Sequence, residues 1–372
     1  MVFENKTPFP AIGWLSLNNQ AKEFTSVVVR VKYLFDTMNK EGVWSLKLAT
    51  KQDELFGEDI FYDEPLTSSV RFESDYIAYK PHADLIVNAH SYSEEERSWN
   101  CAVKMLRQNK VTEKKELLVK QELKVYGQRY WVDKLLFWEA SRAEPCSKVE
   151  LRYENAFGGF KLNPKYKEGN GEEKYLSFYE KNPVGKGFYL KKHSKKDEME
   201  LAQIESIDEP VYEPFTTFEP QGLGFIHRSR KNRLLLAGTF DDVWTQTKSP
   251  IMPDDFKEEH NNGAHPNLQY REGYFKGNDV VELYRLLKGK EKQSFKLPNF
   301  YFKGRYHVQD KALPFYLDID TVIVDILEEN MDNNAVYVSY RKRVRHSPKV
   351  EKVSLSMIVP KDFVAKKEEE EQ

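Results

Sequence analysis

The chain has 372 residues, with 57 basic against 59 acidic side chains and a formal net charge of −2, so no overall field would draw it onto nucleic acid or an anionic membrane. Hydrophobic residues make up 40% of the chain and aromatic residues 13%, enough for a large core, and the aromatic excess favours strands. Two cysteines, Cys101 and Cys146, cannot crosslink a chain of this size, so we expect two reduced thiols.

The first third of the chain predicts strands. In residues 26–36, Val27, Val29 and Val31 share one face and alternate with Arg30 and Lys32, which is the period of a half-buried strand. The same kind of signal recurs in residues 44–48, 85–88 and 116–126, and Gly127 then turns the chain into residues 130–132. Strands at such intervals predict a sandwich or a barrel.

The middle of the chain, residues 151–270, is rich in glycine, proline and asparagine, for example in residues 157–159, 182–187 and 220–224. Glycine allows positive φ and proline is excluded from sheet interiors, so we expect mostly coil here. One apolar run, residues 233–239, predicts a strand inside this coil. Asp254 or Asp255, after Pro253, predicts the N-cap of a single helical turn.

The last third returns to strand patterns, in residues 294–297, 300–306, 321–326, 336–340 and 353–359. Residues 280–287 fit a short helix nearly as well as a strand. We therefore expect an all-β, mainly antiparallel fold. Its two sandwich-like blocks, residues 1–150 and 271–365, are joined by the mostly coil region 151–270 and followed by a frayed charged tail, 366–372.

The histidines are the residues on which a metal-dependent activity would depend. His260 and His265 lie near Asp254 and Asp255, a set that could hold a hydrolytic metal. The two histidines are five residues apart around a glycine, however, and do not share one helix face as in an HExxH site. Since Asp, Asn and His are also ordinary turn and capping residues, we expect no metal and no cofactor.

Other catalytic patterns are missing from the sequence. No GxSxG elbow occurs, no Cys–His pair stands in a recognisable setting, and the glycines at 185–187 and 222–224 do not complete GxGxxG. We therefore assign no catalytic residue and expect a protein that is not an enzyme. Two basic stretches, 191–196 and 341–345, could contact acidic partners or could be solvated faces.

Targeting signals are also missing. The N-terminal residues lack a basic region followed by an apolar one, and no run approaches the roughly 18 apolar residues of a membrane span. We expect a cytoplasmic protein without membrane insertion.

A series of motifs in the middle of the chain resembles a known family. In order, they are residues 151–159 (LRYENAFGG), 182–188 (NPVGKGF), 237–244 (AGTFDDVW), 250–256 (PIMPDDF) and 261–266 (NNGAHP), flanked by 80–87 (KPHADLIV), 127–131 (GQRYW) and 313–322 (LPFYLDIDTV). From about residue 25 to residue 340 the chain resembles the domain-of-unknown-function family 2169, accessory proteins of the bacterial type VI secretion system. Residues 222–225 (GLGF) depart from a Pro-Ala-Gly-Phe-like turn of many members.

The resemblance implies an adaptor or chaperone. Such a protein binds a cognate type VI effector in the cytoplasm, often through the N-terminal region of the effector, and promotes its loading onto the VgrG or PAAR spike proteins. The chain ends soon after the resembling region, which implies a stand-alone adaptor. No catalytic residues of the family exist to carry over.

The signature residues have two interpretations, as partner-binding positions or as residues that hold the coil together. The candidate positions are Arg152, Glu154, Phe157, Asp241, Trp244, Asp255 and Asn262. Gly, Trp and Asp in coil commonly have structural roles. Two other functions stay open, a carbohydrate-active or metal-dependent hydrolase on a β-sandwich scaffold and a purely structural part of the secretion machine.

Overall fold

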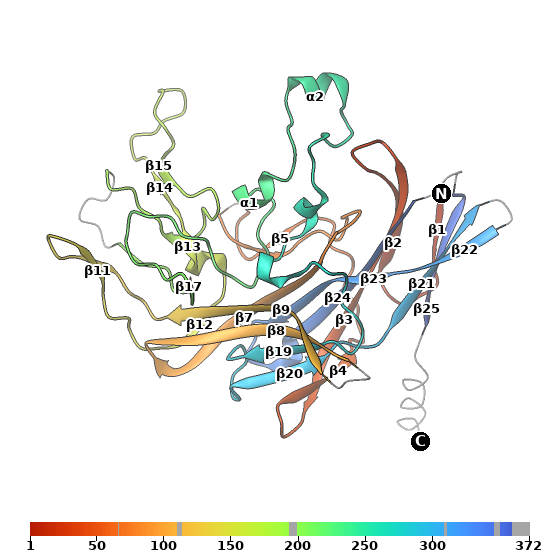
Figure 1. Ribbon diagram of the computed structural model, residues 1–372, viewed down its shortest axis with the longest axis horizontal. Coiled ribbons are helices and arrows are strands. Elements are labelled where there is room, and N and C mark those ends of the chain that lie inside the picture. Colours follow the sequence, from red (N-terminus) through yellow and green to blue (C-terminus); the bar gives the residue numbers. More distant parts are fainter. Residues whose placement is uncertain (66, 110–113, 193–198, 309–310, 346–349, 359–372) are drawn as a thin grey trace.

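The computed structural model describes the chain except residues 66, 110–113, 193–198, 309–310, 346–349 and 359–372. The protein is mostly β, as expected, with a few short helices (Figure 1). The predicted charged tail at 366–372 lies outside the described residues, as do most residues of the basic stretch 191–196. No helix among the described residues is long and apolar enough to cross a membrane.

One large mixed sheet organises the molecule. Thirteen of the described strands belong to it, and its main path runs through strands from both ends of the chain. The order along that path is β12 (Cys146–Glu150), β7 (Ala83–Glu96), β23 (Asp318–Ile326), β24 (Ala335–Arg345), β3 (Glu23–Met38), β4 (Val43–Leu48), β20 (Lys292–Lys296), β19 (Val280–Tyr284), β8 (Ser98–Gln108), β9 (Lys115–Tyr126) and β17 (Ile204–Ser206), with β2 (Ala11–Leu17) on β3 and β18 (Gln269–Tyr270) on β7. The pairs β23–β7 and β20–β4 are parallel, whereas the other pairs in this sheet are antiparallel.

The structure does not confirm two sandwich-like blocks joined by coil. β24 from the last third lies between β23 and β3, and β19 from the last third pairs with β8 from the first third. One continuous hydrophobic core contains residues from both ends of the chain, including Val29, Leu85, Val103, Val322 and Val338. The two halves therefore bury their apolar faces against each other within one sheet, because neither half alone encloses its own core.

A second sheet extends this core near the chain ends. Its strands are β1 (Val2–Asn5), β25 (Lys352–Ile358), β21 (Tyr301–Val308) and β22 (Lys311–Tyr316). Phe302 of β21 contacts Tyr340 of β24, with ring centroids 4.8 Å apart, and Phe9, with centroids 5.8 Å apart. These edge contacts join the two sheets into one body.

Strand β3 differs from its expected half-buried state, since residues 25–31 are all buried. Val27, Val29 and Val31 belong to the main core. The opposite side is covered as well, because Arg30 lies over the ring of Phe56 at 3.7 Å and forms an ion pair with Asp75. A charged residue in an alternating pattern was thus no sign of an exposed face.

The region 151–270 contains small paired elements and a core of its own in addition to coil. The small strand pairs are β13 (Phe157–Gly158) with β16 (Lys186–Gly187) and β14 (Phe160–Leu162) with β15 (Tyr175–Phe178); outside the region lie β10 (Trp131–Asp133) with β11 (Trp138–Ala140) and β5 (Ile60–Phe61) with β6 (Val70–Phe72). The helices are α1 (Lys231–Leu234) and α2 (Asp242–Thr247), with 3-10 turns η1 (Tyr153–Asn155), η2 (Glu258–Asn261), η3 (Pro266–Leu268) and, in the last third, η4 (Met331–Asn333). The smaller core consists of Trp131, Phe157, Tyr179, Met199, Leu201, Ala202 and Val211.

The strand predicted at residues 233–239 is wrong, because the chain forms the helical turn α1 there. Arg233 is the buried member of this run, whereas Leu234 and Leu235 are exposed at 54% and 73%. In this turn Arg233 forms an ion pair with Glu73 and donates to the backbone carbonyls of Ile226 and His260. Residues 280–287, left open between helix and strand, contain strand β19.

Several segments project from the body (Figure 1). Helix α2 lies at the end of an arm, at the top of the view. The hairpins β10–β11 and β14–β15 project separately, at the left of the view. Cys101 is buried, Cys146 is partly buried, and both are free thiols.

Candidate functional site

Arg152 and Glu154 belong to one polar network. The guanidinium of Arg152 donates to Glu154 Oε1 at 2.8 Å and to Asp63 Oδ2 at 2.6 Å, and it lies over the ring of Tyr62. Glu154 also accepts from the backbone N–H and the hydroxyl of Ser69. Burial raises the pKa of Glu154, but the hydrogen bonds from Arg152 and Ser69 outweigh burial and lower it. The network attaches η1 to the β5–β6 hairpin.

Phe157 lies in the smaller core. Its ring makes edge contacts with Tyr179 and Phe218, at centroid separations of 5.3 and 5.2 Å, and is 2% exposed. The next residue, Gly158, has φ +155°, and a Cβ there would lie 2.0 Å from the carbonyl oxygen of Asn182. This tight turn has the structural role that the Gly-Gly motif predicted.

Asp241, Trp244 and Asp255 build the arm that carries α2. Asp241 accepts from the backbone N–H of Trp244 at 2.8 Å and is the N-cap of the helix. The indole N–H of Trp244 donates to the carbonyl of Ile251. The sequence predicted that Asp254 or Asp255 caps a helical turn. Asp255 instead accepts hydrogen bonds from the backbone N–H and the hydroxyl of Thr239 and so closes the base of the arm.

Asn262 joins the region 151–270 to the large sheet. Its side chain is 1% exposed and donates to the carbonyl of His82 and to Asp84 Oδ1. Asp84 in turn accepts from the ammonium of Lys80 at 2.8 Å and from the N–H of Gly263. These bonds hold the segment against β7, although Asn262 Oδ1 is buried and has no hydrogen-bond partner among the described atoms.

The seven signature residues therefore lie in four separate places. Each has contacts within the chain that explain a structural role, and no surface brings all seven together. Their direct contact with a partner stays a prediction.

The two histidines considered for a metal site form separate local bonds. His260 Nδ1 lies 2.9 Å from the carbonyl oxygen of Arg233, and His265 Nδ1 accepts from the N–H of Asn267. Burial lowers the pKa of His265 to about 4. In the part of the chain that the structure describes, no three His, Cys, Asp or Glu side chains are grouped to hold a metal ion.

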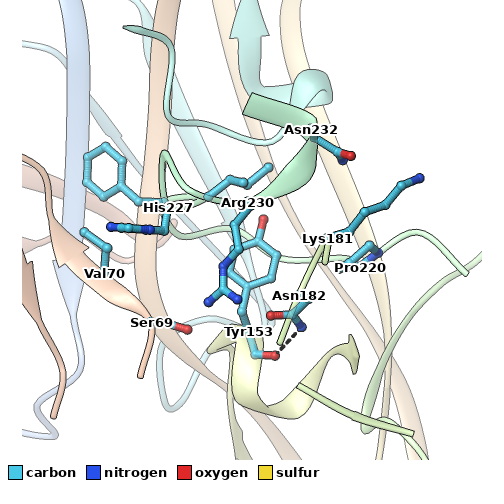
Figure 2. A pocket seen from close by; sticks show the side chains of 11 residues that line it. Ser69, Val70, Tyr153, Lys181, Asn182, Pro220, His227, Arg230 and Asn232 are labelled. Carbon is cyan, nitrogen blue, oxygen red and sulfur yellow. Dashed lines mark hydrogen bonds between the residues drawn. The ribbon is translucent and has the colours of Figure 1, made fainter. Parts of the chain in front are cut away.

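A narrow pocket lies where α1, η1 and strand β6 meet (Figure 2). Its lining includes Ser69, Tyr153, Asn182, His227 and Arg230. The guanidinium of Arg230 lies beside the ring of Tyr153, between His227 and Asn182. The free volume is about 10 Å³, which is room for one water molecule.

Arg230 is the residue that sequence reasoning missed. It belongs to the run Arg228, Ser229, Arg230, Lys231, Asn232, Arg233, which resembles a solvated basic stretch. The structure buries Arg230, the N-cap residue of α1, and Arg233, within α1, at 6% and 5% exposure. Their spacing of three residues, at the start of one helical turn, is the local signal that the sequence offers.

The two buried arginines have different surroundings. Arg233 forms an ion pair with Glu73 and donates to the carbonyls of Ile226 and His260. The side chain of Arg230 makes no hydrogen bond or ion pair with any described residue. Burial lowers the pKa of Arg230 to about 10, opposed by the charges of Glu154 and Tyr153.

Exposed apolar side chains gather at the tips of the projecting segments. At the tip of hairpin β10–β11, Leu135, Leu136 and Phe137 are consecutive and 97%, 94% and 60% exposed. On the α2 arm, Phe240 and Val243 are 54% and 66% exposed. Contiguous apolar exposure of this kind marks contact surfaces in soluble proteins.

Comparison with known proteins finds one family. The family model described as "Uncharacterized protein conserved in bacteria (DUF2169)" matches residues 21–341. No curated protein and no solved structure matches the chain.

Proposed function

The chain belongs to the domain-of-unknown-function family 2169, and from this premise we propose that it is a type VI secretion adaptor. It binds a cognate effector in the bacterial cytoplasm, through the N-terminal region of that effector, and promotes loading onto the VgrG or PAAR spike. The motif resemblance between residues 151 and 266 suggests the secretion role. The observation that supports partner binding is the exposed apolar tip of hairpin β10–β11.

The tip favours an apolar segment as the bound part of the effector. Three consecutive apolar side chains stand almost free of the body, and the flanking charges Lys134 and Glu139 are paired with each other at 3.6 Å. Covering Leu135 and Leu136 with an apolar segment would remove the apolar surface of both from water, and this burial would favour binding by about 25 cal/mol per Å² of buried apolar surface. The adaptor thereby keeps that segment soluble until it reaches the spike.

Strand addition is the less favoured mode of capture at the second sheet. One of the two edge strands of that sheet, β22, contains Pro314, which has no N–H to offer an added strand. Capture by apolar side chains on the projecting tips does not meet this obstacle.

Co-purification with the effector tests the proposal. The chain is co-expressed with a candidate effector. The variants are L135S/L136S and, as a matched control, L15S/L17S. Leu15 and Leu17 are each 52% exposed on strand β2, so the control carries the same chemical change at another surface. We expect the wild type and L15S/L17S to retain the effector and L135S/L136S to lose it.

Two outcomes would contradict different parts of the proposal. Full effector binding by L135S/L136S would show that the tip is not the contact. An effector that stays soluble and is secreted at the wild-type level from a strain lacking this protein would exclude the adaptor role itself. The hydrolase alternative has no supporting observation among the described residues.

A further inference from the structure

Arg230 differs from every other deeply buried arginine that the structure describes. Five arginines are less than 9% exposed, and four of them form an ion pair with a buried carboxylate: Arg30 with Asp75, Arg129 with Glu205, Arg233 with Glu73 and Arg341 with Asp320. Arg230 has no such partner among the described residues. The Arg230 guanidinium is largely withdrawn from water, but none of its nitrogens is among the fully buried atoms that lack a hydrogen-bond partner. Its N–H groups therefore face the pocket, where a ligand that enters can reach them, and a cation held in this way favours an anion as that ligand.

The nearest acidic groups do not neutralise Arg230. Glu154 is close enough to affect its pKa, but the Glu154 carboxylate already accepts from Arg152 and Ser69. No carboxylate of a described residue lies within 4.0 Å of the Arg230 guanidinium, whose N–H groups are open toward the pocket. The pocket therefore presents a positive charge without a direct carboxylate partner among the described residues.

A second donor faces the same pocket. The hydroxyl of Tyr153 is buried and has no hydrogen-bond partner among the described atoms. The Tyr153 ring is held in place because Gly222 packs against it, where a Cβ would lie 2.7 Å from the ring. The electrostatic interaction between Arg230 and Tyr153 shifts the pKa of each side chain, which agrees with their adjacent positions in Figure 2.

The other polar groups of the pocket have different roles. Lys181 forms an ion pair with Glu219, and His227 Nδ1 is bonded to the hydroxyl of Ser229. Burial lowers the pKa of His227, so this ring stays neutral near pH 7. Asn182 donates its two N–H groups to the carbonyls of Tyr153 and Phe157. The anion donors are therefore Arg230 and Tyr153.

We propose that this pocket binds a carboxylate, with the Arg230 guanidinium and the Tyr153 hydroxyl as its donors. A guanidinium donates strong, charge-assisted hydrogen bonds to carboxylate oxygens. The free volume of about 10 Å³ admits one oxygen-sized group beside the guanidinium, so the ligand enters as the narrow end of a chain. A C-terminal carboxylate and an acidic side chain share this chemistry. The inference does not depend on the secretion role.

The test observes the Arg230 side chain directly. The protein is labelled with ¹⁵N-arginine, and the Nε–Hε signals are followed by NMR. The probes are N-acetyl-glycyl-glycine with a free C-terminal carboxylate, its C-terminal amide, N-acetyl-glutamic acid α-amide, and sodium chloride at the same ionic strength. The R230K variant assigns the signal by its disappearance. Arg233, three residues away and fully paired, is the control in the same spectrum.

We expect a saturable shift of the Arg230 signal with a carboxylate probe, no shift with the amide or with chloride, and an unchanged Arg233 signal. Saturation by the glycyl-glycine acid alone identifies a chain terminus, saturation by the glutamic acid amide alone identifies an acidic side chain, and saturation by both identifies the carboxylate group as sufficient.

Affinity variants separate binding from folding. Tyr153→Phe, which keeps the ring, should weaken binding at least about tenfold, the loss expected for one hydrogen bond to a charged group. Arg228→Lys, outside the pocket and paired with Asp59, should bind as the wild type does. No shift with either carboxylate, or an equal shift with chloride as for an adventitious ion only, overturns the proposal.

Discussion

The clearest prediction compares two substitutions three residues apart, Arg233→Met and Arg230→Met. Methionine keeps much of the length and apolar volume of arginine and removes the charge. At position 233 the substitution leaves Glu73, which is 5% exposed, without its ion pair and leaves the carbonyls of Ile226 and His260 without donors. Breaking a buried pair on one side costs about 3–5 kcal/mol of folding free energy.

At position 230 the same substitution removes a buried charge that has no partner among the described residues. The desolvation penalty of that charge disappears and no ion pair is lost, so Arg230→Met should be between neutral and about 2 kcal/mol more stable than the wild type. The two variants are therefore expected to differ by roughly 3–7 kcal/mol, although both arginines are equally buried and lie on one helical turn.

Urea unfolding at pH 7, in chloride buffer without carboxylates, measures the difference through the midpoint and slope of the transition. Adding acetate should raise the midpoint of the wild type and not that of Arg230→Met, because a ligand that binds only the folded state stabilises it. A loss of stability in Arg230→Met as large as in Arg233→Met would refute the reasoning, since it would mean that Arg230 has an internal partner.

Three further outcomes are expected. Burial lowers the pKa of His265 from 6.5 to about 4, so the unfolded chain takes up the proton first as the pH falls. The stability contributed by the neutral ring is complete above pH 6.5 and is lost as the pH falls to 4. His265→Gln should therefore flatten the pH dependence of the urea midpoint between pH 6.5 and 4, and an unchanged pH dependence contradicts this. Gly158→Ala should cost roughly 3 kcal/mol, since its φ is +155° and the Cβ would lie 2.0 Å from the Asn182 carbonyl oxygen, whereas Gly169→Ala, at φ +82° with nothing within 4 Å, should cost clearly less in the same urea assay. Asp241→Ala should cost about 1 kcal/mol of local stability, seen as faster amide hydrogen exchange in α2 with an unchanged global midpoint; a lowered global midpoint would show that the arm is part of the core.

Local patterns predicted many strands correctly. Residues 26–36 lie within β3, residues 116–126 lie within β9, and residues 321–326 lie within β23. Alternation of apolar residues is a property of neighbouring residues, so it can be read without knowing the partners of a strand. The prediction for residues 233–239 was wrong because three leucines and an alanine in a row suggest a buried strand, while the buried residue of that run is Arg233.

Strand partners could not be predicted in the same way. β24 pairs with β3 although Tyr340 and Val29 are far apart in the sequence. No local pattern encodes such a pairing, because it depends on which apolar faces remain to be covered once the whole chain is present. The expected separation into an N-terminal and a C-terminal block reflected sequence order and not the order of strands in space.

The sequence by itself determined the β-rich character of the protein, the residues that bend its central segment and its resemblance to a family, since all of these rest on the identity and spacing of neighbouring residues. The tertiary structure alone decided which charged residues have partners. Arg230 and Arg233 are equivalent in the sequence, but the carboxylate that pairs with Arg233 comes from Glu73, 160 positions away. An ion pair needs atoms within a few ångströms of each other, and only the folded chain brings them together or, at Arg230, leaves one without a partner.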